Sequence, residues 1–243
     1  MVIFLKLLTV HFVVDFFFQT EQFCLKKSNL CTMAGWFYQV LHAFIHSVLS
    51  YLVLMDWCNW VIPVLVFVFH FVIDVIKSMI NVDVFAKTSI QRSNMDCSIF
   101  ILDQIFHIVV LWLLSQYCIC QIGLFFGQLQ DISVWCYIVA YIVVLNPTSI
   151  FICKFVQRWQ DDILQKNTSL IDAGMWIGYA ERVLALTFVL LKQYEALGFL
   201  IAAKSLLRFQ ETDTKQTEYV LIGTLFSFGV AVLLGLLCSC LEL

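Results

Sequence analysis

Eight apolar stretches separated by short polar breaks constrain this chain more than any other feature of its sequence. A helix that crosses a membrane needs about 20 mostly apolar residues, and all but the seventh stretch reach that length. The stretches cover residues 2–22, 36–55, 60–80, 98–119, 132–153, 170–191, 194–208 and 219–240. The sequence therefore predicts an all-α transmembrane bundle of about seven or eight spans.

The composition excludes several other classes of protein. Hydrophobic residues make up 62% of the chain and charged residues 13%, whereas a soluble domain has about 45–50% apolar and about 25% charged residues. A soluble enzyme with this composition could not cover its surface, and neither disorder nor a secreted disulfide scaffold fits. Because the 14 lysines and arginines form no basic run, we expect membrane lipid, and not nucleic acid, as the partner.

The chain reads as a single integral-membrane domain over residues 1–243. Its first part, residues 1–119, carries the histidines, and residues 132–243 supply further apolar helices. Asn146 and Pro147 lie inside the fifth stretch, where proline should kink or end the regular helix.

Basic residues predict which breaks face the cytoplasm. Lysine and arginine gather in the breaks after the odd-numbered stretches, which include Lys26, Lys87 and Lys166. By the positive-inside rule, these breaks should be cytoplasmic.

All five histidines lie in the first four stretches, each four residues from another histidine or from an aspartate. The pairs are His11 with Asp15, His42 with His46, His70 with Asp74, and Asp103 with His107. Residues four apart share one face of an α-helix. Placing such groups at bilayer depth costs about 2.5–3.5 kcal/mol each, so they should face one another or a cavity.

These eight residues are the candidate metal ligands. Five imidazoles and three carboxylates at one depth fit two divalent ions, or one ion with a proton-transfer pair. Zinc, manganese and iron are the candidates for the ion, and Asp15 and Asp103 are candidate catalytic bases. Structural hydrogen bonding and a proton or ion pathway remain the alternatives.

A second polar set follows in the C-terminal half. Glu181 and Arg182 lie in the sixth stretch, and Lys204 and Arg208 lie in the seventh. Together with Lys77, the three cationic residues are candidates for binding the anionic group of a substrate, and Glu181 is a further catalytic candidate. The alternatives are a structural ion pair of Glu181 with Arg182 and ordinary anchoring of the cations at the membrane surface.

Several of these motifs resemble a known bacterial inner-membrane family, labelled domain of unknown function 3307. The similar residues are His11, Asp15, Phe16 and Gln19; His42; His70, Phe71, Asp74 and Lys77; Asp103, Gln104 and His107; and later Gly178, Glu181, Arg182, Lys204, Ser205, Arg208, Glu218, Tyr219, Gly223 and Thr224. The resemblance implies a multi-pass protein of the inner membrane and no particular activity. More distantly, the His/Asp clusters are similar to those of bacterial membrane-bound metal-dependent hydrolases, by analogy of the residues alone.

Three functions follow as hypotheses. The leading one is a membrane-embedded metal-dependent hydrolase with a site near the cytoplasmic leaflet, acting on a lipid or a phosphorylated lipid. The second is a transporter of protons or divalent metal ions. The third is a non-catalytic membrane subunit held together by its polar cluster.

Overall fold

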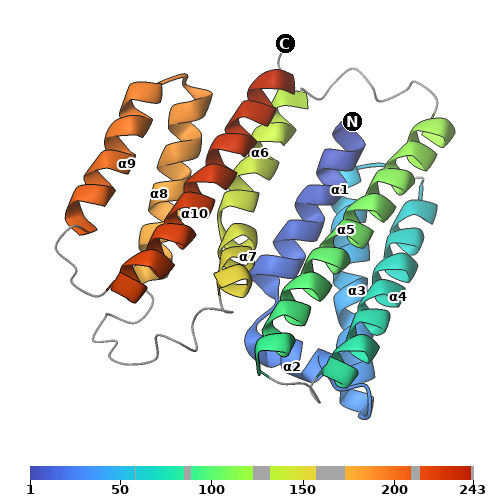
Figure 1. Cartoon of the computed structure of the whole chain (residues 1–243). Coiled ribbons are helices and arrows are strands. Elements are labelled where there is room, and N and C mark those ends of the chain that lie inside the picture. The colour runs from blue at the N-terminus through green and yellow to red at the C-terminus, as the bar shows by residue number, and fades with distance from the viewer. Residues whose placement is uncertain (58, 85–88, 123–131, 157–172, 209–213, 242–243) are drawn as a thin grey trace. The chain divides into compact units, whose positions relative to one another are not determined.

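The computed structural model describes the whole chain except residues 58, 85–88, 123–131, 157–172, 209–213 and 242–243 (Figure 1). Within the described residues, the fold consists of helices and contains no β-strand, which confirms the all-α prediction. The helices group into two compact units, Met1–Trp135 and Cys136–Leu243, which we describe separately.

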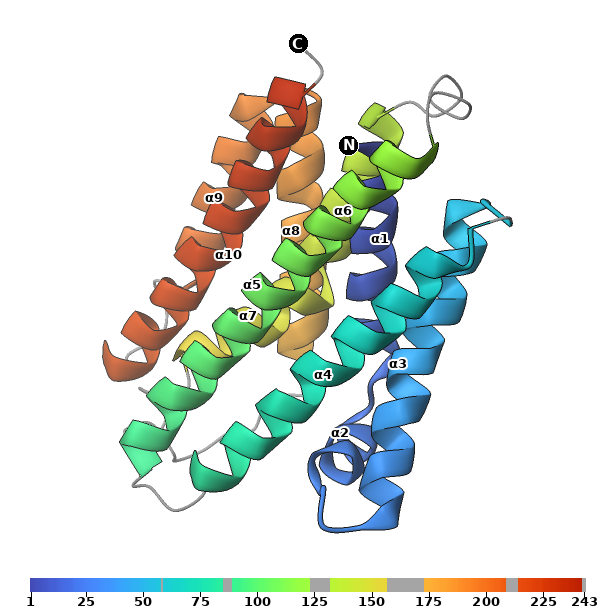
Figure 2. The same cartoon turned by 90° about the vertical axis from the view of Figure 1, so that its right-hand side faces the viewer.

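The first unit is a bundle of four long helices with a short helix at one end (Figures 1 and 2). Its elements are α1 (Val2–Val13), the π-helix η1 (Val14–Phe18), α2 (Glu21–Ser28), α3 (Met33–Leu54), α4 (Val61–Val84) and α5 (Ser89–Ile122). The α3 helix packs against α1 and α4, and α5 packs against the same two helices. The short helix α2 lies against α3, at the end of the bundle opposite the N-terminus of the chain.

The first predicted stretch does not form the single helix that the sequence indicated. After η1 the backbone becomes extended at Gln19, and the helix axis turns by 103° into α2. The Thr20 side chain accepts a hydrogen bond from the backbone N–H of Phe23 and caps the new helix. A run of polar residues from Gln19 to Gln22 explains the break, because it favours a helix start over a continued apolar span.

The α3 helix turns polar side chains toward the interior of the first unit and apolar side chains outward. On α3, buried and exposed residues alternate at helical spacing. The buried set is Gln39, His42, His46 and Ser50, and the exposed set is Phe37, Val40, Phe44 and Val48. An exposed apolar surface of this kind is suited to contact with lipid chains.

The second unit contains the remaining helices. They are α6 (Ile132–Val144, whose first turn belongs to the first unit), α7 (Asn146–Val156), α8 (Ala173–Leu190), α9 (Tyr194–Arg208) and α10 (Thr214–Leu241). The α10 helix packs against α7 and α8, and α9 packs against α8. Close packing of α10 on α8 depends on Gly235, since a Cβ atom there would lie 2.6 Å from Val189 Cγ1.

The predicted interruption of the regular helix at Asn146–Pro147 is confirmed. The α6 helix ends at Val144 and α7 begins at Asn146. The Thr148 hydroxyl donates to the Val143 carbonyl over 2.6 Å, which satisfies an acceptor near the break.

Five helical segments of the described chain are long and apolar enough to cross a membrane, and six are if the bent pair of α1–η1 and α2 counts as one span. They indicate a membrane protein. The expected seven or eight spans are not confirmed, and α9, with 15 residues, is shorter than the roughly 20 that a span needs. Lys87 and Lys166 lie outside the described residues, so the predicted orientation stays a prediction.

Candidate metal centre

The structure brings all eight predicted ligands together inside the first unit. Each of the four long helices contributes two of them, with α1 and η1 supplying His11 and Asp15. No histidine is more than 4% exposed, and the three aspartate side chains are at most 9% exposed. The pairing by i, i+4 spacing thus identified residues that meet in one buried cluster.

One group of four residues could hold a metal ion. Asp15, His42, His46 and His70 each offer a ligand atom, and these atoms all lie within 4.8 Å of one another. Asp15 Oδ1 lies 3.0 Å from the Nε2 atoms of both His42 and His46 and 3.6 Å from His70 Nε2. In a tetrahedral site with bonds of about 2.0–2.1 Å, neighbouring ligand atoms are about 3.3–3.4 Å apart. The three distances from Asp15 Oδ1, 3.0–3.6 Å, are therefore close to the edges of a metal-ligand tetrahedron.

Hydrogen bonding among the side chains accounts poorly for this arrangement. Four polar atoms lie within 3.5 Å of His42 Nε2: Gln19 Nε2 at 2.7 Å, Asp15 Oδ1 at 3.0 Å, His70 Nε2 at 3.1 Å and Asp74 Oδ2 at 3.5 Å. A ring nitrogen has either one hydrogen or one lone pair, so it can satisfy only one of them. The same atoms could instead serve as ligands of a metal ion.

The π-helix η1 places the carboxylate of this group. Asp15 is its second residue, and the chain leaves the helix at Gln19, whose amide contacts His42. A π-turn inserts one extra residue into a helix and is frequent at functional sites. Asp15 Oδ2 still lies 3.8 Å from His11 Nε2, so the predicted pair persists across the change of helix type.

A second group is formed by His70, Asp74 and His107, whose ligand atoms also lie within 4.8 Å of one another. His70 belongs to both groups, and its ring stacks on that of His46 with centroids 3.6 Å apart. His107 is oriented by a 2.9 Å hydrogen bond from its Nδ1 to the Asp103 carbonyl. Asp103 therefore supports the cluster through its main chain as well as its carboxylate.

Two lysines neutralise carboxylates at the edge of the cluster. The Lys77 ammonium lies 2.5 Å from Asp103 Oδ2, and its side chain is 30% exposed. Lys27, which the sequence indicated only as part of a basic break, is buried and lies 2.8 Å from Asp74 Oδ2. Sequence reasoning missed this contact because it depends on the turn at Gln19, which carries α2 back to the bundle.

The lysine contact is held in place by Gln39. Its side-chain N–H groups donate to the Lys27 carbonyl over 3.1 Å and to the Ser78 hydroxyl over 2.8 Å. Gln39 lies one turn before His42 on the buried face of α3, which is the sequence signal that could have identified it.

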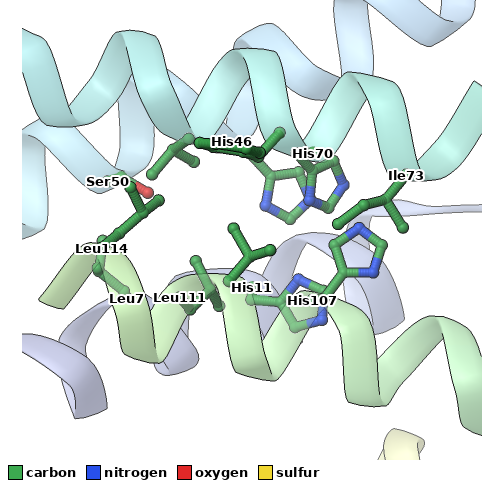
Figure 3. Close-up of a pocket in the computed structure, with 12 residues that line it drawn as sticks. Leu7, His11, His46, Ser50, His70, Ile73, His107, Leu111 and Leu114 are labelled. Atoms are coloured by element: carbon green, nitrogen blue, oxygen red, sulfur yellow. The ribbon is translucent and has the colours of Figure 1, made fainter.

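A cavity of about 10 Å³ adjoins the histidines, which is about the space that one water molecule needs. Figure 3 shows His11, His46, His70 and His107 gathered at one end of it and Leu7, Ser50 and Leu114 at the other. The cavity gives the metal centre an apolar side, away from the two lysines.

The predicted substrate-binding residues of the C-terminal half lie in the second unit. Glu181 forms an ion pair with Lys204, which joins α8 to α9. Arg182 is buried, and its guanidinium donates to the carbonyls of Val144 and Leu145 and to two serine hydroxyls. Arg208 ends α9, and its side chain lies outside the described part of the structure. Their role in substrate binding stays a prediction.

Comparison with known proteins gives one match. The model of the family described as "Protein of unknown function (DUF3307)" matches residues 3–133, which include the whole His/Asp cluster. No curated protein and no solved structure matches the chain.

Proposed function

The chain belongs to the DUF3307 family, and we propose that it is a membrane-embedded, metal-dependent hydrolase. Its metal centre would be formed by Asp15, His42, His46 and His70. The observation that carries the proposal is the convergence of one carboxylate oxygen and three imidazole nitrogens within 4.8 Å of one another in the interior of the bundle.

The donor set restricts the metal. Three imidazoles with one carboxylate suit zinc, manganese or iron better than calcium or magnesium, which prefer oxygen ligands. Four protein ligands complete a tetrahedral zinc site, whereas manganese and iron accept further ligands and leave room for water or substrate.

The surrounding residues fit hydrolysis of an anionic lipid. A bound divalent ion would polarise a phosphoryl or acyl oxygen and activate a water molecule. Asp103 is the best-placed base, because its Oδ1 is buried and has no hydrogen-bond partner among the described residues. Lys77, partly exposed beside it, would exchange its carboxylate partner for the substrate's anionic group. The apolar outer surface of the bundle favours a substrate that arrives through the lipid.

The test is elemental analysis of protein purified without chelators, followed by hydrolysis assays on phosphorylated lipids. We expect bound metal in the unmodified protein and loss of both metal and activity in Asp15→Asn. The matched control is Asp56→Asn, which makes the same chemical change in the loop after α3, outside the cluster. Folded, metal-free wild-type protein would overturn the proposal, and so would equal metal content in the two variants.

One observation favours transport as a second candidate. The α1–η1 segment breaks at Gln19 beside the cluster, and broken helices next to buried charges are common in ion transporters. A transporter reconstituted in lipid vesicles should move protons or divalent ions down a gradient, and Asp15→Asn should abolish that flux. Hydrolysis without flux would leave the hydrolase as the function.

A further inference from the structure

We infer that the first unit binds a second divalent cation, with Asp74 and His107 as its own ligands and His70 within reach of either position. This inference rests on the proposed metal centre and extends it from one ion to two. The three residues come from two helices, α4 and α5, and their ligand atoms lie within 4.8 Å of one another.

The orientation of His107 is the first argument. Its Nδ1 donates to the Asp103 carbonyl over 2.9 Å, so its Nε2 carries the lone pair. Fixing one ring nitrogen on a main-chain carbonyl is the usual way in which a protein orients the other nitrogen toward a metal. That Nε2 atom is buried and has no hydrogen-bond partner among the described residues.

His11 supplies a second nitrogen of the same kind. Its Nε2 lies 3.2 Å from Gln104 Oε1, which can only accept, so the proton lies on Nε2 and the lone pair on Nδ1. This Nδ1 is also buried and has no partner among the described side chains and main chain. The rings of His11 and His107 stack with centroids 4.8 Å apart. A buried imidazole lone pair without a partner costs free energy, and binding a cation is one way in which a protein can use it.

His70 links the two positions. Its Nε2 lies 3.6 Å from Asp15 Oδ1 and 3.4 Å from Asp74 Oδ2. Since a ring nitrogen binds one ion at a time, His70 can serve only one of the positions when both ions are bound. Asp74 and His107 are therefore the ligands that belong to the second position alone.

Lys27 tunes the second position. Its ammonium lies 2.8 Å from Asp74 Oδ2, the oxygen that the second ion would need. The Lys27 ammonium and a divalent cation would therefore compete for the same carboxylate oxygen. For this reason the second ion should bind more weakly than the first.

The experiment counts ions per chain by native mass spectrometry while the purified protein is titrated with manganese. We expect two ions in the unmodified protein and one in His107→Phe, which keeps a ring against His11 but removes the nitrogen. One ion in both proteins would overturn the inference and leave the proposed function standing. No ion in His107→Phe would show that the positions are not separate, and no ion in the wild type would end both proposals.

A second pair of variants keeps the inference testable if His107→Phe does not fold. Lys27→Met should tighten the weaker manganese site on the order of tenfold, because it releases Asp74 and removes a nearby positive charge. Lys26→Met is the matched control, since Lys26 is exposed and contacts Tyr38 instead of the cluster. Equal affinities for the weaker ion in these two variants would overturn the assignment of Asp74 to the second position.

Discussion

The two units differ in how completely the hydrogen-bonding capacity of their buried polar side chains is used. In the second unit, Arg182 uses its Nε, Nη1 and Nη2 atoms to donate to carbonyl and hydroxyl oxygens around the α6–α7 break. In the first unit, buried polar atoms of four residues have no hydrogen-bond partner among the described residues: His11, Gln39, Asp103 and His107. Satisfied buried charge stabilises a fold, whereas unsatisfied buried lone pairs indicate a ligand. The comparison indicates a structural role for the Arg182 contacts, and it is consistent with the metal-dependent role that we propose for the His/Asp cluster.

The largest effect on stability is expected for Arg182, whose guanidinium is hydrogen-bonded within the second unit. Replacing Arg182 with methionine leaves the Val144 and Leu145 carbonyls without their donors inside the protein. We expect the free energy of unfolding to fall by about 3 kcal/mol, the scale of breaking a buried charged contact. Denaturation followed by helical circular dichroism measures it.

Metal content is the second readout for Arg182→Met. Folded variant protein should still bind the same number of ions as the wild type, because the ligands all lie in the first unit. A stable Arg182→Met protein that has lost its metal would break the comparison, since Arg182 would then belong to the site.

A smaller loss of stability is expected from a substitution beside the turn that joins α2 to α3. A Cβ atom on Gly35 would lie 1.9 Å from the Asn29 carbonyl oxygen, so Gly35→Ala must push the α2–α3 turn away. We expect the free energy of unfolding to fall by about 1–3 kcal/mol, measured by denaturation followed by circular dichroism. Unchanged stability would mean that α2 is not held by this turn.

Gln19 should affect the metal without affecting the fold. Its amide Nε2 lies 2.7 Å from His42 Nε2, the nitrogen that the first ion would need, so a hydrogen donated there competes with the ion. Gln19→Leu should therefore tighten binding of the first ion by roughly fivefold, the equivalent of about one net hydrogen bond, at unchanged melting temperature. Gln22→Leu, an exposed neighbour on α2, is the control and should leave the affinity as it is.

The smallest effect is expected for Glu181 and Lys204. Their ion pair is partly exposed, at 15% and 19% of the side-chain surface. A double-mutant cycle with Glu181→Gln and Lys204→Met should give a coupling energy of about 1 kcal/mol or less. A large coupling energy, or loss of hydrolysis in the single variants, would indicate that Glu181 and Lys204 take part in the proposed function.

The sequence was most informative where periodicity and chemistry agreed. The shared i, i+4 spacing of His42 with His46 and of His70 with Asp74 was enough to predict that these side chains meet. Exposing them to lipid would cost free energy, so the polar faces of the helices turn toward one another. The interruption of the helix at Pro147 was also predictable from a single residue, because proline lacks the backbone N–H that a continued helix needs.

Contacts that depend on a change of direction could not be predicted. Lys27 reaches Asp74 only because the chain turns by 103° after η1. Arg182 donates to the carbonyls of Val144 and Leu145, which lie 38 and 37 positions before it along the chain. Residues at such separations carry no periodic signal, so their partners emerge only from the packed helices.

The π-helix η1 has a consequence for how an ion could leave. Shifting a helix by one residue rotates the following side chains by about 100°. If η1 relaxed to a regular α-helix, Asp15 would swing away from His42 and His46 while the four-helix bundle stayed closed. The change of η1 from a π-helix to an α-helix would then remove one ligand from the ion. The exchange rate of the ion would depend on the rate of this local change and not on unfolding of the surrounding protein.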